Sequence, residues 1–195
     1  MSAPSMAGVA AFTAKIAIEA GNAMEATFAS VQAGDRDGAM FMAKEATAKA
    51  LLAKKAMTSG LHKQTEADTP SSRAALGHIE DARLFAKAAM DVCRGYARRV
   101  SDKGGGEAGK KAAETLAFMM LAATTLLDIK RGSYVETSLR KAAAAAERAA
   151  QAAEGAAQAG GAGNIHAEEA QAAKQTATEL ARRALWAVRE AQQKH

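Results

Sequence analysis

The stretch from Glu114 to Asp128, ETLAFMMLAATTLLD, places thirteen uncharged residues between two acids. No other segment of the chain is as apolar on every side. A helix that is hydrophobic all round lies either at the centre of a helical bundle or in a membrane. Because a membrane span needs about 20 apolar residues, the stretch predicts a buried helix at the centre of a bundle.

The composition favours helices around a shallow core. The 195 residues include 54 alanines but only 28 residues of Leu, Ile, Val and Phe together. Alanine is the best helix former, but burying its methyl group stabilises far less than burying leucine, since the gain is about 25 cal/mol per Å². We therefore expect helices that approach closely across small side chains. The net charge of +5 keeps self-repulsion mild.

Glycine-rich breaks and a polar linker divide the chain. The breaks are centred near residues 36, 104 and 162, and the linker covers residues 61–69. Thr69 and Pro70 fit the N-cap and the first position of a helix. We therefore predict an all-α protein, an antiparallel up-and-down bundle of five to six helices in three helical hairpins. It would be a single domain over residues 1–195 with a hinge at 61–69. The expected helices cover about residues 5–33, 38–60, 70–102, 107–131, 134–159 and 165–193.

The spacing of apolar residues predicts which side chains face the core. In the helix over 38–60, the residues expected to face inward are Met40, Phe41, Ala43, Ala50, Leu51 and Met57. In the helix over 70–102, the predicted seam runs from Leu76 to Val100. It includes Arg83, unless Ala82 takes that position. Methionines can line an adaptable groove, although they more often fill gaps in a core short of leucine. The candidate residues for a hydrophobic core or ligand groove are Phe118, Met119, Met120, Leu121, Met40, Phe41 and Met90.

A basic patch is expected around the turn near residue 104. Such a patch could bind phosphates or an acidic partner. Cations near the C-terminus of a helix also interact favourably with its dipole without any partner. Acids are interleaved throughout and only Tyr96 offers a stacking surface, so nucleic acid is disfavoured. The candidate residues are Arg94, Arg98, Arg99, Lys103, Lys110 and Lys111.

Motifs for chemistry are weak. The run from Gly104 to Lys111 fits G-x-x-x-x-G-K, but it lacks the Ser or Thr that holds magnesium, and a helical pattern precedes it instead of a strand. No Glu is followed by His three positions later, as a carboxylate-bridged di-iron bundle requires. His166, close to a helix start, is interpreted as a surface residue. We therefore predict no catalytic residue, no metal ligand and no cofactor.

The single cysteine, Cys93, excludes an intramolecular disulfide framework and suits a reducing compartment. The first residues lack the basic segment that opens a secretory signal. A cytoplasmic protein without a transmembrane segment is the expectation.

These features predict a non-enzymatic interaction or structural protein. It would associate with itself as a homo-oligomer, or with another helical protein, through the alanine-rich faces of the last two helices. A first alternative is a bundle that binds a lipid or another hydrophobic ligand. Granule-coat proteins of the phasin kind are similar in alanine content, but no motif of theirs is present. A second alternative is a helical metal-binding or nucleic-acid-binding protein that uses the basic patch.

Overall fold

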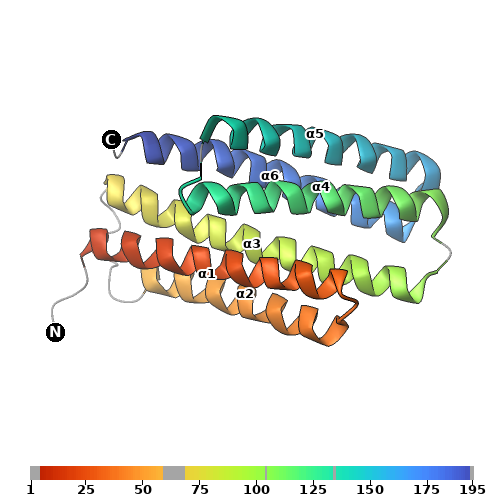
Figure 1. Cartoon of the computed structure of the whole chain (residues 1–195), viewed down its shortest axis with the longest axis horizontal. Helices are drawn as coiled ribbons and strands as arrows, with labels where there is room; N and C mark the ends of the chain where they lie inside the picture. The colour runs from red at the N-terminus through yellow and green to blue at the C-terminus, as the bar shows by residue number, and fades with distance from the viewer. Residues whose placement is uncertain (1–4, 59–68, 104, 134, 194–195) are drawn as a thin grey trace.

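The computed structural model describes residues 5–58, 69–103, 105–133 and 135–193, and these residues form helices and turns without a strand (Figure 1). The predicted all-α, antiparallel up-and-down bundle is confirmed. Most of the predicted linker at 61–69 lies outside the described residues. The helices are α1 (Met6–Gln32), α2 (Arg36–Thr58), α3 (Pro70–Ser101), α4 (Gly106–Lys130), α5 (Val135–Gly160) and α6 (Ile165–Gln193).

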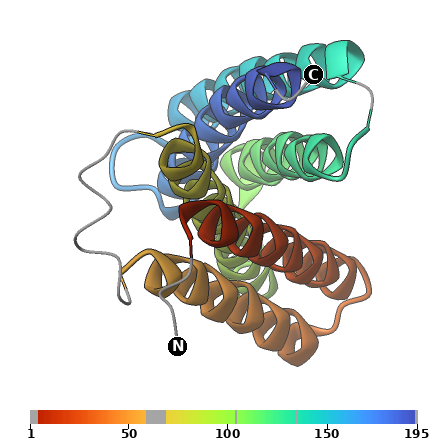
Figure 2. The same cartoon turned by 90° about the vertical axis from the view of Figure 1, so that its left-hand side faces the viewer.

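The six helices form two sets of three, as the view along the helices shows (Figure 2). In the first set α1, α2 and α3 pack against one another, and in the second set α4, α5 and α6 do the same. The helices α1 and α2, and likewise α5 and α6, form close hairpins. The contact of α3 with α4 is less extensive, because the chain crosses from one set to the other between them. Helix α3 also packs against α6, and it therefore joins the two sets.

Local sequence accounts for where the helices begin and end. Thr69 and Ser72 form a reciprocal capping box that spans Pro70, the first residue of α3, which confirms the predicted start of this helix. The carboxylate of Asp35 accepts a hydrogen bond of 2.9 Å from the backbone N–H of Gly38 and caps α2. Gly34 ends α1 with a φ of 74°, a left-handed conformation that glycine adopts without a steric penalty.

The core combines a few large side chains with long alanine seams. Phe85 of α3 and Met24 of α1 are fully buried, and so is Met119 of α4. Cys93 of α3 is 4 % exposed. Between α5 and α6 the buried residues are almost all alanines, so these helices pack through methyl groups. The buried alanines of the two helices include Ala142, Ala145, Ala149, Ala153, Ala156, Ala170, Ala173, Ala177 and Ala184.

The predicted inward face of α2 is right for Ala43, which is fully buried, but wrong for its large residues Met40, Phe41 and Leu51. Phe41 is 63 % exposed and Leu51 is 54 % exposed, and Met40 also lies at the surface with 36 % exposed. The buried face of α2 consists only of small residues, which let this helix lie close to α1 and α3 and leave no room there for large side chains. The residues of that face are Ala39, Ala43, Ala46 and Ala53.

The predicted seam of α3 is wrong at both ends. Leu76 is 54 % and Val100 is 48 % exposed. Leu76 and Arg83 are seven residues apart, so they share one face of the helix, and this face points to solvent. Ala82 is fully buried, as the alternative register required.

Helix α4 is not covered on every side, which corrects the prediction from its apolar stretch. By length and composition it is the one helix among the described residues that could cross a membrane, but 56 % of its most apolar window is buried inside the protein. That burial is typical of a core helix in a soluble protein. Nevertheless Leu121 is 44 % exposed, because no helix lies over this side of α4.

Candidate functional site

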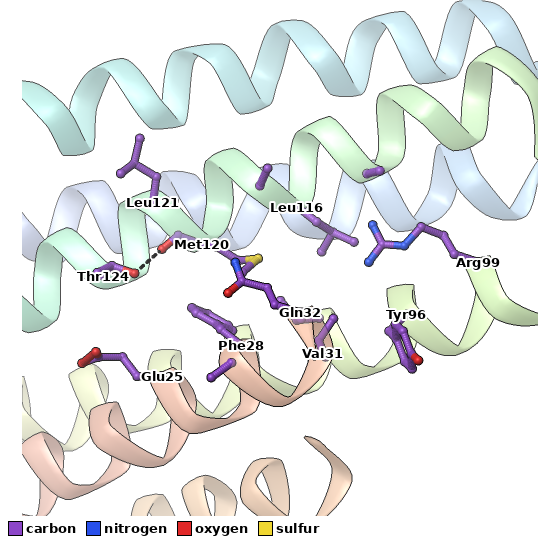
Figure 3. A pocket seen from close by; sticks show the side chains of 14 residues that line it. Glu25, Phe28, Val31, Gln32, Tyr96, Arg99, Leu116, Met120, Leu121 and Thr124 are labelled. Carbon is purple, nitrogen blue, oxygen red and sulfur yellow. Dashed lines mark hydrogen bonds between the residues drawn. The ribbon is translucent and has the colours of Figure 1, made fainter. Parts of the chain in front are cut away.

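The open side of α4 borders a groove of about 660 Å³ that α1, α3 and α4 form together (Figure 3). Its deep wall is buried: Phe28 is 6 %, Val92 is 1 % and Leu116 is 2 % exposed. Leu121 stands at the rim, and Met120 lies between the wall and the rim. The groove is therefore apolar in its depth and open to solvent at its mouth. The other lining residues are Glu25, Ala29, Val31, Gln32, Tyr96, Arg99, Ala113, Ala117 and Thr124.

The groove exists because small residues lie where α1 and α4 face each other. Ala29 of α1 and Ala113 and Ala117 of α4 line it without filling it. The contact between α1 and α4 is slight compared with the contacts inside each three-helix set. The groove is thus a consequence of how the two sets meet.

The charged residues of the groove lie at its two ends (Figure 3). At one end the carboxylate of Glu25 is paired at 2.6 Å with Arg131, just after α4. Towards the other end the hydroxyl of Tyr96 donates a hydrogen bond of 3.1 Å to the carbonyl of Gly34. Arg99, in the last turn of α3, extends its guanidinium towards Leu116. Within the described part of the chain this guanidinium makes no hydrogen bond or ion pair.

The structure separates the predicted apolar candidates. Met120 and Leu121 line the groove, whereas Met119 is fully buried and Met90 packs at the edge of the core. Phe118 faces α5, where the guanidinium of Arg148 lies 5.8 Å from the centre of its ring. The remaining candidates, Met40 and Phe41, lie on the solvent side of α2, because alanines occupy its buried face.

The six predicted basic residues lie on several sides of the same end of the bundle. Arg94 and Arg98 line a small pocket of about 100 Å³ towards α6, together with Asp91, Glu168 and Glu169. Arg99 lies at the groove instead. The remaining three are Lys111, which pairs with Glu114 at 3.3 Å on the side of α5, and the exposed Lys103 and Lys110.

A polar cluster at this end combines three helices and was not predicted. His166 of α6 is 2 % exposed, so its interpretation as a surface residue is wrong. Its Nε2 lies 2.9 Å from a carboxylate oxygen of Asp102, which follows α3, and Gly105 approaches the same ring. On the other side of the ring, Nδ1 lies 3.8 Å from a carboxylate oxygen of Glu169. The turns before α4 and α6 thus enclose the imidazole.

Glu169 is buried, and neighbouring groups compensate the negative charge of its carboxylate only in part. Burial raises the pKa of its carboxyl, and the positive charges of Arg98 and Arg99 offset this only in part. Arg98 is the nearest partner, at 3.9 Å. Neither carboxylate oxygen of Glu169 has a hydrogen-bond partner, and the same is true of His166 Nδ1. The spacing His166-x-x-Glu169 is visible in the sequence, but the di-iron motif has the opposite order, Glu-x-x-His, so the motif does not identify this pair. Among the described residues, no group of three or more His, Cys, Asp and Glu is placed to hold a metal ion.

A second buried cluster lies near the opposite end. Asp81 of α3 is fully buried and accepts hydrogen bonds from Lys130 of α4 at 2.8 Å and from Arg183 of α6 at 2.7 Å. Burial alone would raise the pKa of Asp81, but the two cations outweigh it and hold this pKa below its ordinary value. Lys130 also lies 2.8 Å from Nδ1 of His78. This cluster links the two sets of helices, and no part of it opens into the groove.

No protein-family model matches the chain, and neither a curated protein nor a solved structure shows significant similarity to it. The geometry of the groove and of the two polar clusters is therefore the basis for a functional proposal.

Proposed function

We propose that the protein is a non-enzymatic binding module that holds a hydrophobic ligand in the groove between α1, α3 and α4. The observation that carries this proposal is the open apolar groove beside a helix whose other sides are packed. Its volume of about 660 Å³ falls within the range of about 300–1,000 Å³ that is typical of ligand sites. Filling it would remove Leu121, Met120 and their neighbours from water, which stabilises a complex in proportion to the apolar area covered.

The packing of the alanine faces supports this proposal over self-association. The alanine-rich faces of α5 and α6, which motivated the predicted homo-oligomer, pack against each other within one chain. The groove remains as an apolar surface that no helix covers. Association with itself or with another helical protein stays a prediction, and light scattering at high micromolar concentration would reject the homo-oligomer by showing a monomer.

The proposal is tested with N-phenyl-1-naphthylamine, an uncharged dye whose fluorescence rises in apolar surroundings. The purified protein should bind the dye, and Leu121→Asp should weaken binding by about tenfold or more, because it places a charge at the apolar rim. The matched control is Leu185→Asp on α6, since Leu185 is 41 % exposed, close to the 44 % of Leu121, and does not line the groove.

Unchanged binding by Leu185→Asp is expected. The proposal fails if the wild-type protein does not bind the dye, or if the two variants lose affinity equally. Circular dichroism of both variants checks that their helices are intact.

A further inference from the structure

We infer that the ligand of this groove is a fatty acid, with its carboxylate held by Arg99 and its hydrocarbon tail against the wall of α1 and α4. The inference rests on the proposed function and adds the chemical class of the ligand. It depends on three observations: the position of Arg99, the compensation of charge at the opposite end, and the size of the groove.

Arg99 is the only Lys or Arg among the described residues that line the groove. Its guanidinium extends over the apolar wall near Leu116 (Figure 3). There it can contact the head group of a ligand without a rearrangement of the α3 backbone. The adjacent Arg98 lies closest to the buried Glu169, at 3.9 Å, while Arg99 acts on that carboxylate only through its charge. The hydrogen-bonding positions of the Arg99 guanidinium therefore remain open to an incoming carboxylate, and this geometry suits a bidentate pair.

The opposite end of the groove does not offer an equivalent charge. The one acid among the lining residues is Glu25, and Arg131 pairs with it at 2.6 Å. Between the ends the lining is apolar apart from Gln32, Tyr96 and Thr124, and the hydroxyls of Tyr96 and Thr124 already donate to backbone carbonyls. An amphiphile with one anionic end matches this arrangement, whereas a cationic head group would be repelled by the positive charge of Arg99.

The size of the groove suits a single hydrocarbon chain. Along α4 the lining residues run from Ala113 to Thr124, a distance of about 17 Å at 1.5 Å per residue. A methylene group takes up about as much space as a water molecule in the liquid, roughly 30 Å³, so a twelve-carbon chain needs roughly 360 Å³.

The experiment compares three twelve-carbon amphiphiles that differ only in the head group: dodecanoate, dodecan-1-ol and dodecylammonium. Each is titrated against the protein loaded with the uncharged dye, below its micelle-forming concentration. We expect dodecanoate to displace the dye at a concentration about tenfold lower than dodecan-1-ol, because a hydrogen bond between two charged groups adds to the contact of the tail. Dodecylammonium should be the weakest of the three.

Variants of Arg99 and Arg94 test where the head group of the ligand binds. Arg99→Gln should weaken dodecanoate by about tenfold and leave dodecan-1-ol unchanged, whereas Arg99→Lys should retain a part of the preference. The matched control is Arg94→Gln, which removes the same charge from the same helix on the side facing α6. It should leave all three affinities unchanged.

The outcomes separate the two proposals. If no amphiphile and no dye binds, the proposed function fails and the inference fails with it. If dodecanoate and dodecan-1-ol bind equally, the groove takes apolar ligands but the inference is wrong. Tightest binding of dodecylammonium, or an equal loss in Arg94→Gln and Arg99→Gln, would also overturn the inference, because the selectivity would then come from another site or from the general surface charge.

Discussion

At the scale of single residues, Glu169 is the one side chain among the described residues with two buried polar atoms that lack a hydrogen-bond partner. It is 5 % exposed, and neither of its carboxylate oxygens accepts a hydrogen bond. A buried polar group without partners costs about 1–3 kcal/mol of stability. The position next to His166 and Arg98 therefore reduces the stability of the fold when the carboxyl is ionised.

The pH dependence of this effect has a definite sign. Burial raises the pKa of Glu169 above its ordinary value of 4.5. An acid with a raised folded-state pKa stabilises the fold fully below its unfolded-state pKa, and this contribution is lost as the pH rises through the folded-state value. Glu169→Gln should consequently raise the free energy of unfolding at pH 7 by about 1 kcal/mol, and the gain should vanish at a pH below 4.5.

Urea unfolding at the two pH values measures this gain. The control is Glu168→Gln, since Glu168 is exposed and adjacent in sequence, and it should change the stability by less than about 0.5 kcal/mol. A loss of stability in Glu169→Gln at pH 7 would contradict the prediction, because it would show that attraction to Arg98 and Arg99 outweighs the cost of burial.

At the scale of helices, close approach across glycine decides the geometry at the junction of the two sets. A Cβ at Gly95 of α3 would meet side-chain atoms of Leu116 on α4 and Glu169 on α6. Glycine in the middle of a helix is otherwise less stable than alanine by about 0.5–1 kcal/mol. Its presence at position 95 fits the need for three helices to converge there.

Two substitutions from glycine to alanine should therefore have opposite effects. Gly95→Ala should lower the free energy of unfolding by about 1–3 kcal/mol, because overpacking a buried contact forces the neighbours apart. Gly155→Ala on α5 should raise it by about 0.5–1 kcal/mol, since the added methyl would meet only the flexible side chain of Lys111, at 3.3 Å. Thermal unfolding followed by circular dichroism measures both. Equal changes in the two variants would contradict the proposed role of Gly95.

The sequence predicted the helices well and their faces less well. The boundaries followed from local chemistry, as the capping box at Thr69 and the glycine at position 34 illustrate. The buried face of α2 did not follow from the sequence pattern. Phe41 and Leu51 are among the larger apolar residues of that helix, whereas the fold buries its alanines. Hydrophobic size predicts burial only where neighbouring helices leave room for large side chains.

The candidate site was only partly predictable for a similar reason. Met120 and Leu121 were identified from the apolar stretch, but nothing in the sequence places Phe28 or Val92 opposite them. The six basic residues are close in sequence, yet Arg98 and Arg99 point to different pockets because adjacent residues of a helix lie about 100° apart. Sites assembled from three helices depend on packing that one sequence does not reveal.

At the scale of the whole molecule, the cluster of Asp81, Lys130 and Arg183 holds the two sets of helices together away from the groove. The side chains of Asp81 and Lys130 are 0 % and 5 % exposed. Removing one partner of a buried ion pair costs about 3–5 kcal/mol, because it leaves a buried charge without compensation. The cluster therefore makes the relative position of α3, α4 and α6 specific.

Asp81→Asn should lower the free energy of unfolding at pH 7 by about 3–5 kcal/mol. Because the folded-state pKa of Asp81 lies below its ordinary value of 3.8, its contribution is fully present above that pH and is lost as the pH falls through the lower folded-state value. The destabilisation, measured by urea unfolding, should therefore shrink on acidification.

The control for this cluster is Asp128→Asn. Asp128 lies 3.9 Å from Arg131 and its side chain is 48 % exposed, so the change should be below about 1 kcal/mol. Similar losses in the two variants would show that burial of the cluster adds nothing beyond a surface ion pair.

The burial of the lone thiol at Cys93 has a practical consequence. Burial raises its pKa, so the thiolate form that reacts with alkylating reagents is scarce while α3 stays in contact with its neighbours. The rate of alkylation then reports how often local opening of α3 exposes the Cys93 thiol to solvent. Because the neighbouring residue Val92 lines the groove, a bound ligand should lower the rate of alkylation of Cys93, and mass spectrometry measures this rate without any other label.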